Sequence, residues 1–69
     1  MKEAIEMLEK MPPYIQHNNQ LMLLEITKRH GEWRIVYVGN GEKVYFCHLE
    51  LIVAVEKMYG WLVGDGYIK

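Results

Sequence analysis

Four side chains in this sequence have the chemistry to hold a metal ion or act as a nucleophile: Cys47, its neighbour His48, and the distant His17 and His30. A thiolate with nearby imidazoles is a common metal-ligand set and a common nucleophilic pair. Residues 43–48, however, alternate like a strand, and adjacent strand residues point to opposite faces. We therefore expect no metal, no cofactor and no catalytic residue. We interpret Cys47 as a small buried thiol and His48 as a cap of the turn after the strand.

The acidic residues also lack the arrangement that an enzyme needs. The nine carboxylates are spread along the chain, and no two separate elements clearly bring a pair together for general acid–base chemistry. The segment Gly64-Asp65-Gly66 has no preceding strand, no following helix and no Lys-Ser/Thr pair, so it is not a phosphate-binding loop. We predict a protein that is not an enzyme.

A basic and aromatic group is the chemistry that remains. Lys28 and Arg29 lie at the end of one predicted strand, and Arg34, Lys43 and Tyr45 lie on the next two. Cations interleaved with aromatic rings bind single-stranded nucleic acid by neutralising phosphates and stacking on bases. A small nucleic-acid-binding regulator is therefore one hypothesis, although three nearby glutamates offset much of this charge.

Length and composition predict one small folded domain. The chain has 69 residues, of which 51% are hydrophobic, and its net charge of −1 gives no long-range field for nucleic acid or an anionic membrane. No apolar run spans a membrane and the N-terminal acids exclude a signal peptide, so we expect a complete, cytoplasmic protein.

A single cysteine allows no internal disulfide. Because so small a core has a thin stability margin, we expect a protein partner or self-association as a homodimer.

Apolar periodicity predicts an α+β fold in the order α-β-β-β-α. Helical spacing over residues 2–11 ends at Pro12-Pro13, and the polar residues 14–20 predict a loop. Alternating runs over 21–28, 33–38 and 43–48 predict a three-stranded antiparallel meander, with turns at His30-Gly31 and Asn40-Gly41. Asn-Gly favours a turn whose two central residues both have positive φ. Helical spacing returns over 49–63, and both helices should pack on one face of the sheet.

Two-residue turns determine the register of both predicted hairpins. They place Ile26 opposite Ile35 and Val36 opposite Tyr45. Both hairpins then agree on one apolar face, which we predict to be the core: Met22, Leu24, Ile26, Trp33, Ile35, Tyr37, Val44 and Phe46. The opposite, open face carries Leu23, Glu25, Thr27, Arg34, Val36, Val38, Lys43, Tyr45 and Cys47.

The open face is more apolar than a solvated sheet face should be. An apolar centre with a charged rim is the anatomy of a protein interface. Two alternatives remain: a helix wraps over this side, or the β-branched residues serve only strand propensity. We predict the following partner-binding residues on it: Leu23, Arg34, Val36, Val38, Lys43 and Tyr45.

Trp61 is a second candidate anchor for a partner. In a continuous second helix it lies away from the core stripe and would be exposed, and tryptophan is a frequent interface anchor. Two alternatives would cover it: the first helix packs against that side, or the chain leaves the helix at Gly60 and forms a terminal hairpin. We favour the continuous helix, because the apolar stripe continues to Val63 and Gly64 suits the position after a helix end.

These patterns predict a small non-enzymatic protein-binding module of the adaptor or inhibitor type that also self-associates. The alternative is the nucleic-acid-binding regulator described above. A lesser alternative, by analogy of general shape alone, is an inhibitor of a host protein encoded by a phage or mobile element.

Overall fold

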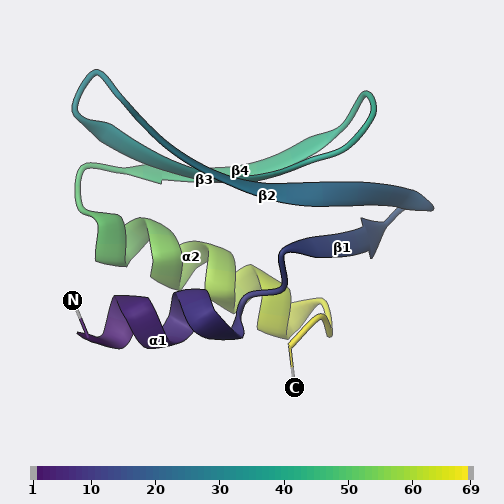
Figure 1. Cartoon of the computed structure of the whole chain (residues 1–69), viewed down its shortest axis with the longest axis horizontal. Coiled ribbons are helices and arrows are strands. Elements are labelled where there is room, and N and C mark those ends of the chain that lie inside the picture. The colour runs from purple at the N-terminus through teal and green to yellow at the C-terminus, as the bar shows by residue number, and fades with distance from the viewer. Residues whose placement is uncertain (1, 69) are drawn as a thin grey trace.

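The computed structural model describes residues 2–68, and its side chains from residue 5 to residue 68. Along these residues the elements are α1 (Lys2–Lys10), β1 (Tyr14–His17), β2 (Gln20–Arg29), β3 (Glu32–Val38), β4 (Lys43–His48) and α2 (Leu51–Gly64). They form a small compact α+β domain in which both helices lie on one face of a curled antiparallel sheet (Figure 1).

The sheet of the described residues has four strands in the order β1-β2-β3-β4, so the prediction of three is wrong. Residues expected to form a loop form β1 instead, with Tyr14 opposite Leu23 and His17 opposite Gln20. The β1–β2 turn is Asn18-Asn19, and both residues have positive φ, at 51° and 64°. Asparagine tolerates this conformation better than most residues, and a turn of this kind matches the twist of a hairpin.

The register predicted for the two later hairpins is confirmed. Ile26 lies opposite Ile35, and Val36 lies opposite Tyr45. At the first of these turns His30 and Gly31 both have positive φ, at 53° and 82°. At Asn40-Gly41 only the glycine does, at 89°, so the turn conformation expected from Asn-Gly is wrong although the register is right.

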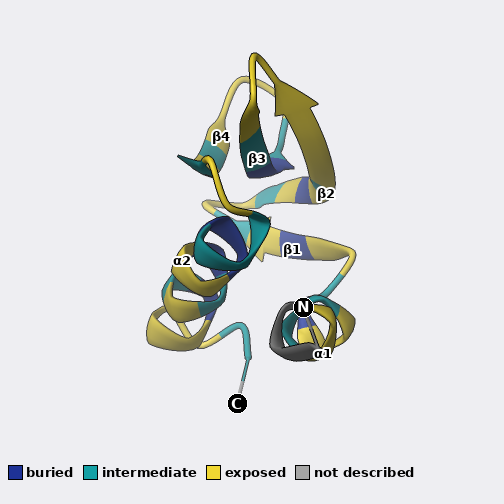
Figure 2. Cartoon of the chain, turned by 90° about the vertical axis from the view of Figure 1, so that its left-hand side faces the viewer, coloured by how far each residue is buried: buried dark blue, intermediate teal, exposed yellow. Residues whose placement is uncertain are grey.

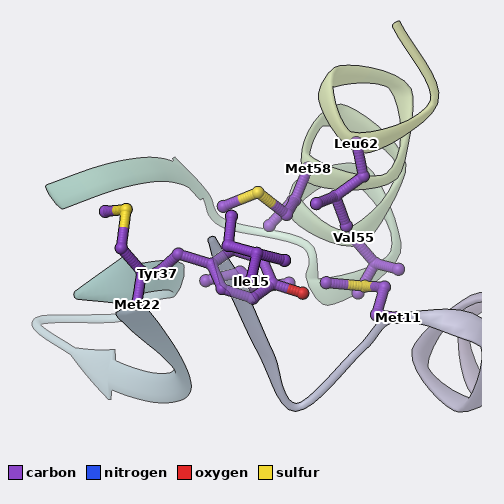
Figure 3. Close-up of a cluster of buried hydrophobic side chains, with 9 residues drawn as sticks. Met11, Ile15, Met22, Tyr37, Val55, Met58 and Leu62 are labelled. Carbon is purple, nitrogen blue, oxygen red and sulfur yellow. The ribbon is translucent and has the colours of Figure 1, made fainter. Parts of the chain in front are cut away.

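The core lies between the sheet and α2. Met22, Ile35 and Tyr37 of the sheet pack against Val55, Met58 and Leu62 of α2, and all six are fully buried (Figure 3). Met11 and Ile15 close the core on the side of α1 and β1. Ile26, predicted to be a core residue, is 41% exposed. The hairpin between β2 and β3 bends away from the helices (Figure 1), and Ile26 belongs to its β2 strand.

One hydrogen bond secures the link between α1 and β1. The Tyr37 hydroxyl donates to the Pro12 carbonyl oxygen at 2.8 Å, which gives a partner to a polar group whose residue is fully buried. Burial raises the pKa of Tyr37 from 10.0 to about 12, because removal from water disfavours the charged phenolate.

Helix α2 runs without a break through Gly60, as predicted. It ends through backbone bonds in which the Asp65 N–H donates to the Trp61 carbonyl at 2.9 Å and the Gly66 N–H donates to the Val63 carbonyl at 3.1 Å. Gly64 is the last residue of α2, so the prediction that it follows the helix end is wrong; the glycine with positive φ after α2 is Gly66, at 85°. α2 packs on β3 and β4, while α1 lies beside α2 on the side of β1 and β2 (Figure 2).

Candidate functional site

The sheet face opposite the helices is concave, because both later hairpin turns bend away from the helices (Figure 1). Residues that pair across strands share a face, so the register arranges its side chains in rows. We call the following set the concave face: Gln16 and Leu21; Tyr14, Leu23, Val38 and Lys43; Glu25, Val36 and Tyr45; Thr27, Arg34 and Cys47.

Four large apolar side chains on the concave face are about half exposed. The exposed fractions are 59% for Tyr14, 52% for Leu21, 53% for Leu23 and 49% for Tyr45. Since a large side chain can present on the order of 200 Å², these four together expose roughly 400 Å². Exposed apolar patches of this size often mark interaction sites. Tyr14 and Leu21 extend the surface that the sequence predicted, because β1 adds a strand to it.

Val36, at the centre of the concave face, is only 5% exposed. The prediction that it contributes contact surface is therefore wrong. The sheet curls around this position, and the cross-strand partners Glu25 and Tyr45 place longer side chains on either side of the short valine. Val38 is half-buried and lies beside the exposed Leu23.

Charge is distributed unevenly across the concave face. Two cations lie against one ring on the β4 side, the Arg34 guanidinium 5.2 Å and the Lys43 ammonium 5.7 Å from the centroid of Tyr45. Contacts of this kind are attractive and hold the cations in place. On the β2 side the exposed charge is the carboxylate of Glu25. The face therefore has an apolar floor with cations along one side and an acid along the other.

The structure separates the residues proposed to bind nucleic acid. Lys28 pairs with Trp33 and its ammonium lies 5.0 Å from that ring, on the face that carries the core. Arg34, Lys43 and Tyr45 lie on the concave face instead. A single strand running along one face could not contact all of them.

A shallow pocket of about 80 Å³ lies at the tip of the β2–β3 hairpin and is lined by Arg29, His30, Glu32, Arg34 and Cys47. Pockets that enclose small metabolites usually measure about 300–1,000 Å³. This pocket is too small for such a ligand, and it extends the concave face with a mixed-charge end.

Cys47 and His48 point to opposite faces, as predicted for adjacent strand residues. The Glu50 N–H donates to Nδ1 of His48 at 3.0 Å, which confirms His48 as the cap of the turn before α2. Cys47 is half-buried on the concave face, so the expectation of a buried thiol is wrong. The sheet curls but leaves this end of the face partly open.

Trp61 is half-buried, so the exposure expected for it is wrong. Its ring packs against His17 with a centroid distance of 5.3 Å and an angle of 68° between planes, and against Tyr67 at 5.5 Å and 35°. Nδ1 of His17 and the Tyr67 hydroxyl are hydrogen-bonded at 2.6 Å. Partial burial and the nearby negative charge of Asp65 both raise the pKa of Tyr67. Trp61 is covered by Tyr67 and by His17 of β1, a strand that the sequence did not predict, and α2 has no break at Gly60.

Neither helix within the described residues is long and apolar enough to cross a membrane. Comparisons of this chain with protein-family models, with curated proteins and with solved structures find no match.

Proposed function

We propose that this chain is a small non-enzymatic protein-binding module, and that the concave face is its binding surface. The observation that carries the proposal is the gathering of Tyr14, Leu21, Leu23 and Tyr45, each about half exposed, on one face with charges at its margins. An apolar centre of roughly 400 Å² within a charged rim corresponds to one side of a standard interface, which buries about 800 Å² per partner and is just over half apolar.

The shape of the concave face favours a convex partner element. Neighbouring strands lie about 4.8 Å apart, so the floor from β2 to β4 is about 10 Å wide, which matches the diameter of an α-helix. A helix or a protruding loop of a partner protein can rest on Leu23 and Val38. Its charges would meet Arg34 and Lys43 on one side and Glu25 on the other. Such a surface suits an adaptor or an inhibitor that covers a partner's site.

The charges and rings of the concave face support a protein partner over nucleic acid. The Tyr45 ring already contacts two cations of its own chain, which compete with a base for its faces. Glu25 and Glu32 lie among the cations of this face and its tip, and Lys28 lies on the opposite face. Phosphate neutralisation and base stacking are both weakened by this arrangement.

Capture of partners by an immobilised protein tests the proposal when it is made with matched variants. Leu23→Glu places a carboxylate in the middle of the apolar floor. Gly60→Glu adds the same residue at an exposed position of α2 where a side chain meets open space. We expect a protein that is retained by the wild type and by Gly60→Glu and is depleted at least about tenfold by Leu23→Glu, as measured by quantitative mass spectrometry. Equal retention by both variants would contradict the role of the concave face.

A further inference from the structure

The outer edge of β4 differs from the outer edge of β1 in how it is protected. β1 has four residues and follows Pro12-Pro13, and short strands and prolines both block the addition of another strand. β4 has six residues, contains no proline, and keeps an uninterrupted register with β3. No strand of the described residues pairs with its outer edge. This edge can accept a further strand.

The hydrogen-bond pattern shows which backbone groups face outward from β4. The Leu24 N–H donates to the Pro13 carbonyl at 3.0 Å, so its backbone groups face β1. Leu24 is paired with Tyr37 of β3, and the directions of the backbone groups alternate along an antiparallel strand. The backbone groups of the odd-numbered residues 33–37 of β3 therefore face β4, and those of their partners in β4 face β3. The Gly39 N–H, which donates to the Glu42 carbonyl at 2.8 Å, continues the same alternation. The outward-facing backbone groups therefore belong to Lys43, Tyr45 and Cys47.

An apolar flank of α2 lies beside this open edge. Trp61 contacts His17 of β1, so its side of the helix faces the opposite edge of the sheet. At 100° per residue, Ile52, Tyr59 and Val63 lie about 180–200° around the helix from Trp61, on the side of β4. Val63 is 47% exposed, and Ile52 and Tyr59 are partly exposed. Leu49, between β4 and α2, is 68% exposed. In Figure 2 this side of α2 and β4 carries no covering element.

We propose that a second copy of this chain docks here, with the two β4 strands antiparallel across a two-fold axis and the two α2 flanks in contact. Tyr45 of each copy lies opposite Tyr45 of the other, and Lys43 lies opposite Cys47 of the other copy. In this register the backbone N–H and C=O groups that face outward from one β4 meet the outward-facing groups of the other β4. About six backbone hydrogen bonds form, whereas the register centred on Phe46 forms roughly four. The result is a continuous eight-stranded sheet.

A second copy fits this surface better than another partner because both halves of the surface are self-complementary. An isologous interface brings the same patch from each subunit together, so an open edge meets an open edge and an apolar flank meets an apolar flank. The contact runs along α2, which is about 21 Å long for its 14 residues, and spans both layers of the fold. The two Lys43 side chains are about 14 Å apart along the paired strands, so they do not repel strongly.

Dimerisation through β4 leaves Tyr14, Leu21 and Leu23 of the concave face exposed, because they lie toward the other edge of the sheet. The two proposals share Lys43, Tyr45 and Cys47 but rest on different observations, so either can fail without the other. Dimerisation adds to the proposed binding function by giving one assembly two concave faces on the same side of one sheet.

Disulfide trapping tests the register directly. Residues opposite each other in a hydrogen-bonded pair have Cα atoms about 5.5 Å apart, within the range of a disulfide. Tyr45→Cys in a Cys47→Ser background should therefore form a covalent dimer under mild oxidation. Lys43→Cys in the same background is the matched control, because its two copies lie about 14 Å apart and should remain mostly uncrosslinked. Equal trapping at both positions would overturn the proposed register.

Sedimentation of the unoxidised chain tests the interface itself. The wild type should pass from monomer to dimer across about 1 µM to 1 mM. Val63→Lys, on the apolar flank, should raise the dissociation constant at least about tenfold, whereas Gly60→Lys, on the solvent side of α2, should leave it unchanged. Circular dichroism should show that both variants fold. A monomer throughout, or equal effects of the two lysines, would overturn the inference. Even if the dimer is ruled out in this way, the capture experiment can still support the concave face as a binding surface, if Leu23→Glu loses a protein that the wild type retains.

Discussion

The Tyr67 hydroxyl lies 2.6 Å from Nδ1 of His17, fifty residues earlier in the chain. This hydrogen bond joins the segment after α2 to β1, the short edge strand, and Trp61 packs beside both rings. The contact explains why Trp61, at the margin of the core, is half-buried. We infer that Trp61 supports the fold, and the concave face stays the candidate binding surface.

The hydrogen bond between His17 and Tyr67 should stabilise the fold. Tyr67→Phe keeps the aromatic packing against Trp61 but removes the hydroxyl, so we expect a loss of about 1 kcal/mol in the free energy of unfolding. Urea denaturation followed by circular dichroism measures it. Tyr14→Phe is the matched control. Tyr14 is 59% exposed, so the loss of its hydroxyl should hardly change the free energy of unfolding. A loss that is no larger for Tyr67→Phe than for the control would mean that the contact does not secure β1.

Two glycines should respond in opposite directions to the same substitution. A Cβ atom at Gly60 meets nothing within 4 Å, so Gly60→Ala should raise the free energy of unfolding by about 1 kcal/mol through helix propensity. A Cβ atom at Gly39 would lie 2.9 Å from Cγ of the fully buried Met22 and 2.9 Å from Oε1 of Gln20. Gly39→Ala should therefore lower the free energy of unfolding by roughly 1–3 kcal/mol. Thermal or urea denaturation checks both, and the same sign for both would contradict this packing.

Tyr37→Phe should destabilise the chain at neutral pH. The substitution leaves the Pro12 carbonyl oxygen without its donor, at an expected cost of about 1–2 kcal/mol in the free energy of unfolding. Urea denaturation at pH 7 measures the cost. Tyr14→Phe again serves as the control, and an equal effect of the two variants would contradict the structural role of the Tyr37 hydroxyl.

The same tyrosine should make stability depend on alkaline pH. The unfolded chain releases the Tyr37 proton near pH 10, whereas the folded chain holds it to about pH 12. Between these values the unfolded state binds fewer protons, so the stability that Tyr37 contributes falls as pH rises, by roughly 1 kcal/mol per pH unit. Other groups titrate in this range as well. The informative quantity is therefore the difference between the wild type and Tyr37→Phe, which should shrink from pH 10 upward; a constant difference would show that burial does not perturb this tyrosine.

Much of the fold could be predicted from the sequence because local signals agreed with one another. His30-Gly31 and Asn40-Gly41 each implied a two-residue turn, and both turns put the same alternating residues on one face. Ile35 and Tyr37 therefore fell into the core correctly. The register did not depend on the conformation of Asn40, which differs from the expected one.

The remaining errors come from features that local patterns do not carry. β1 has only Ile15 buried, so its polar composition suggested a loop, and the one available signal was the pair Asn18-Asn19. Missing β1 led directly to the wrong environment for Trp61. Val36 was misjudged for another reason: the alternation of residues gives the face of a side chain but not the curl of the sheet that buries it.

The most direct test of the concave face is photo-crosslinking from within it. A benzoylphenylalanine in place of Leu23 keeps an apolar aromatic group at a half-exposed position, and the same residue in place of Gly60 serves as the control on the outer side of α2. We predict a discrete crosslink to a protein partner from position 23, lost when Tyr14→Glu is introduced, and none from position 60. Crosslinks from position 60 alone, or from neither position, would contradict it.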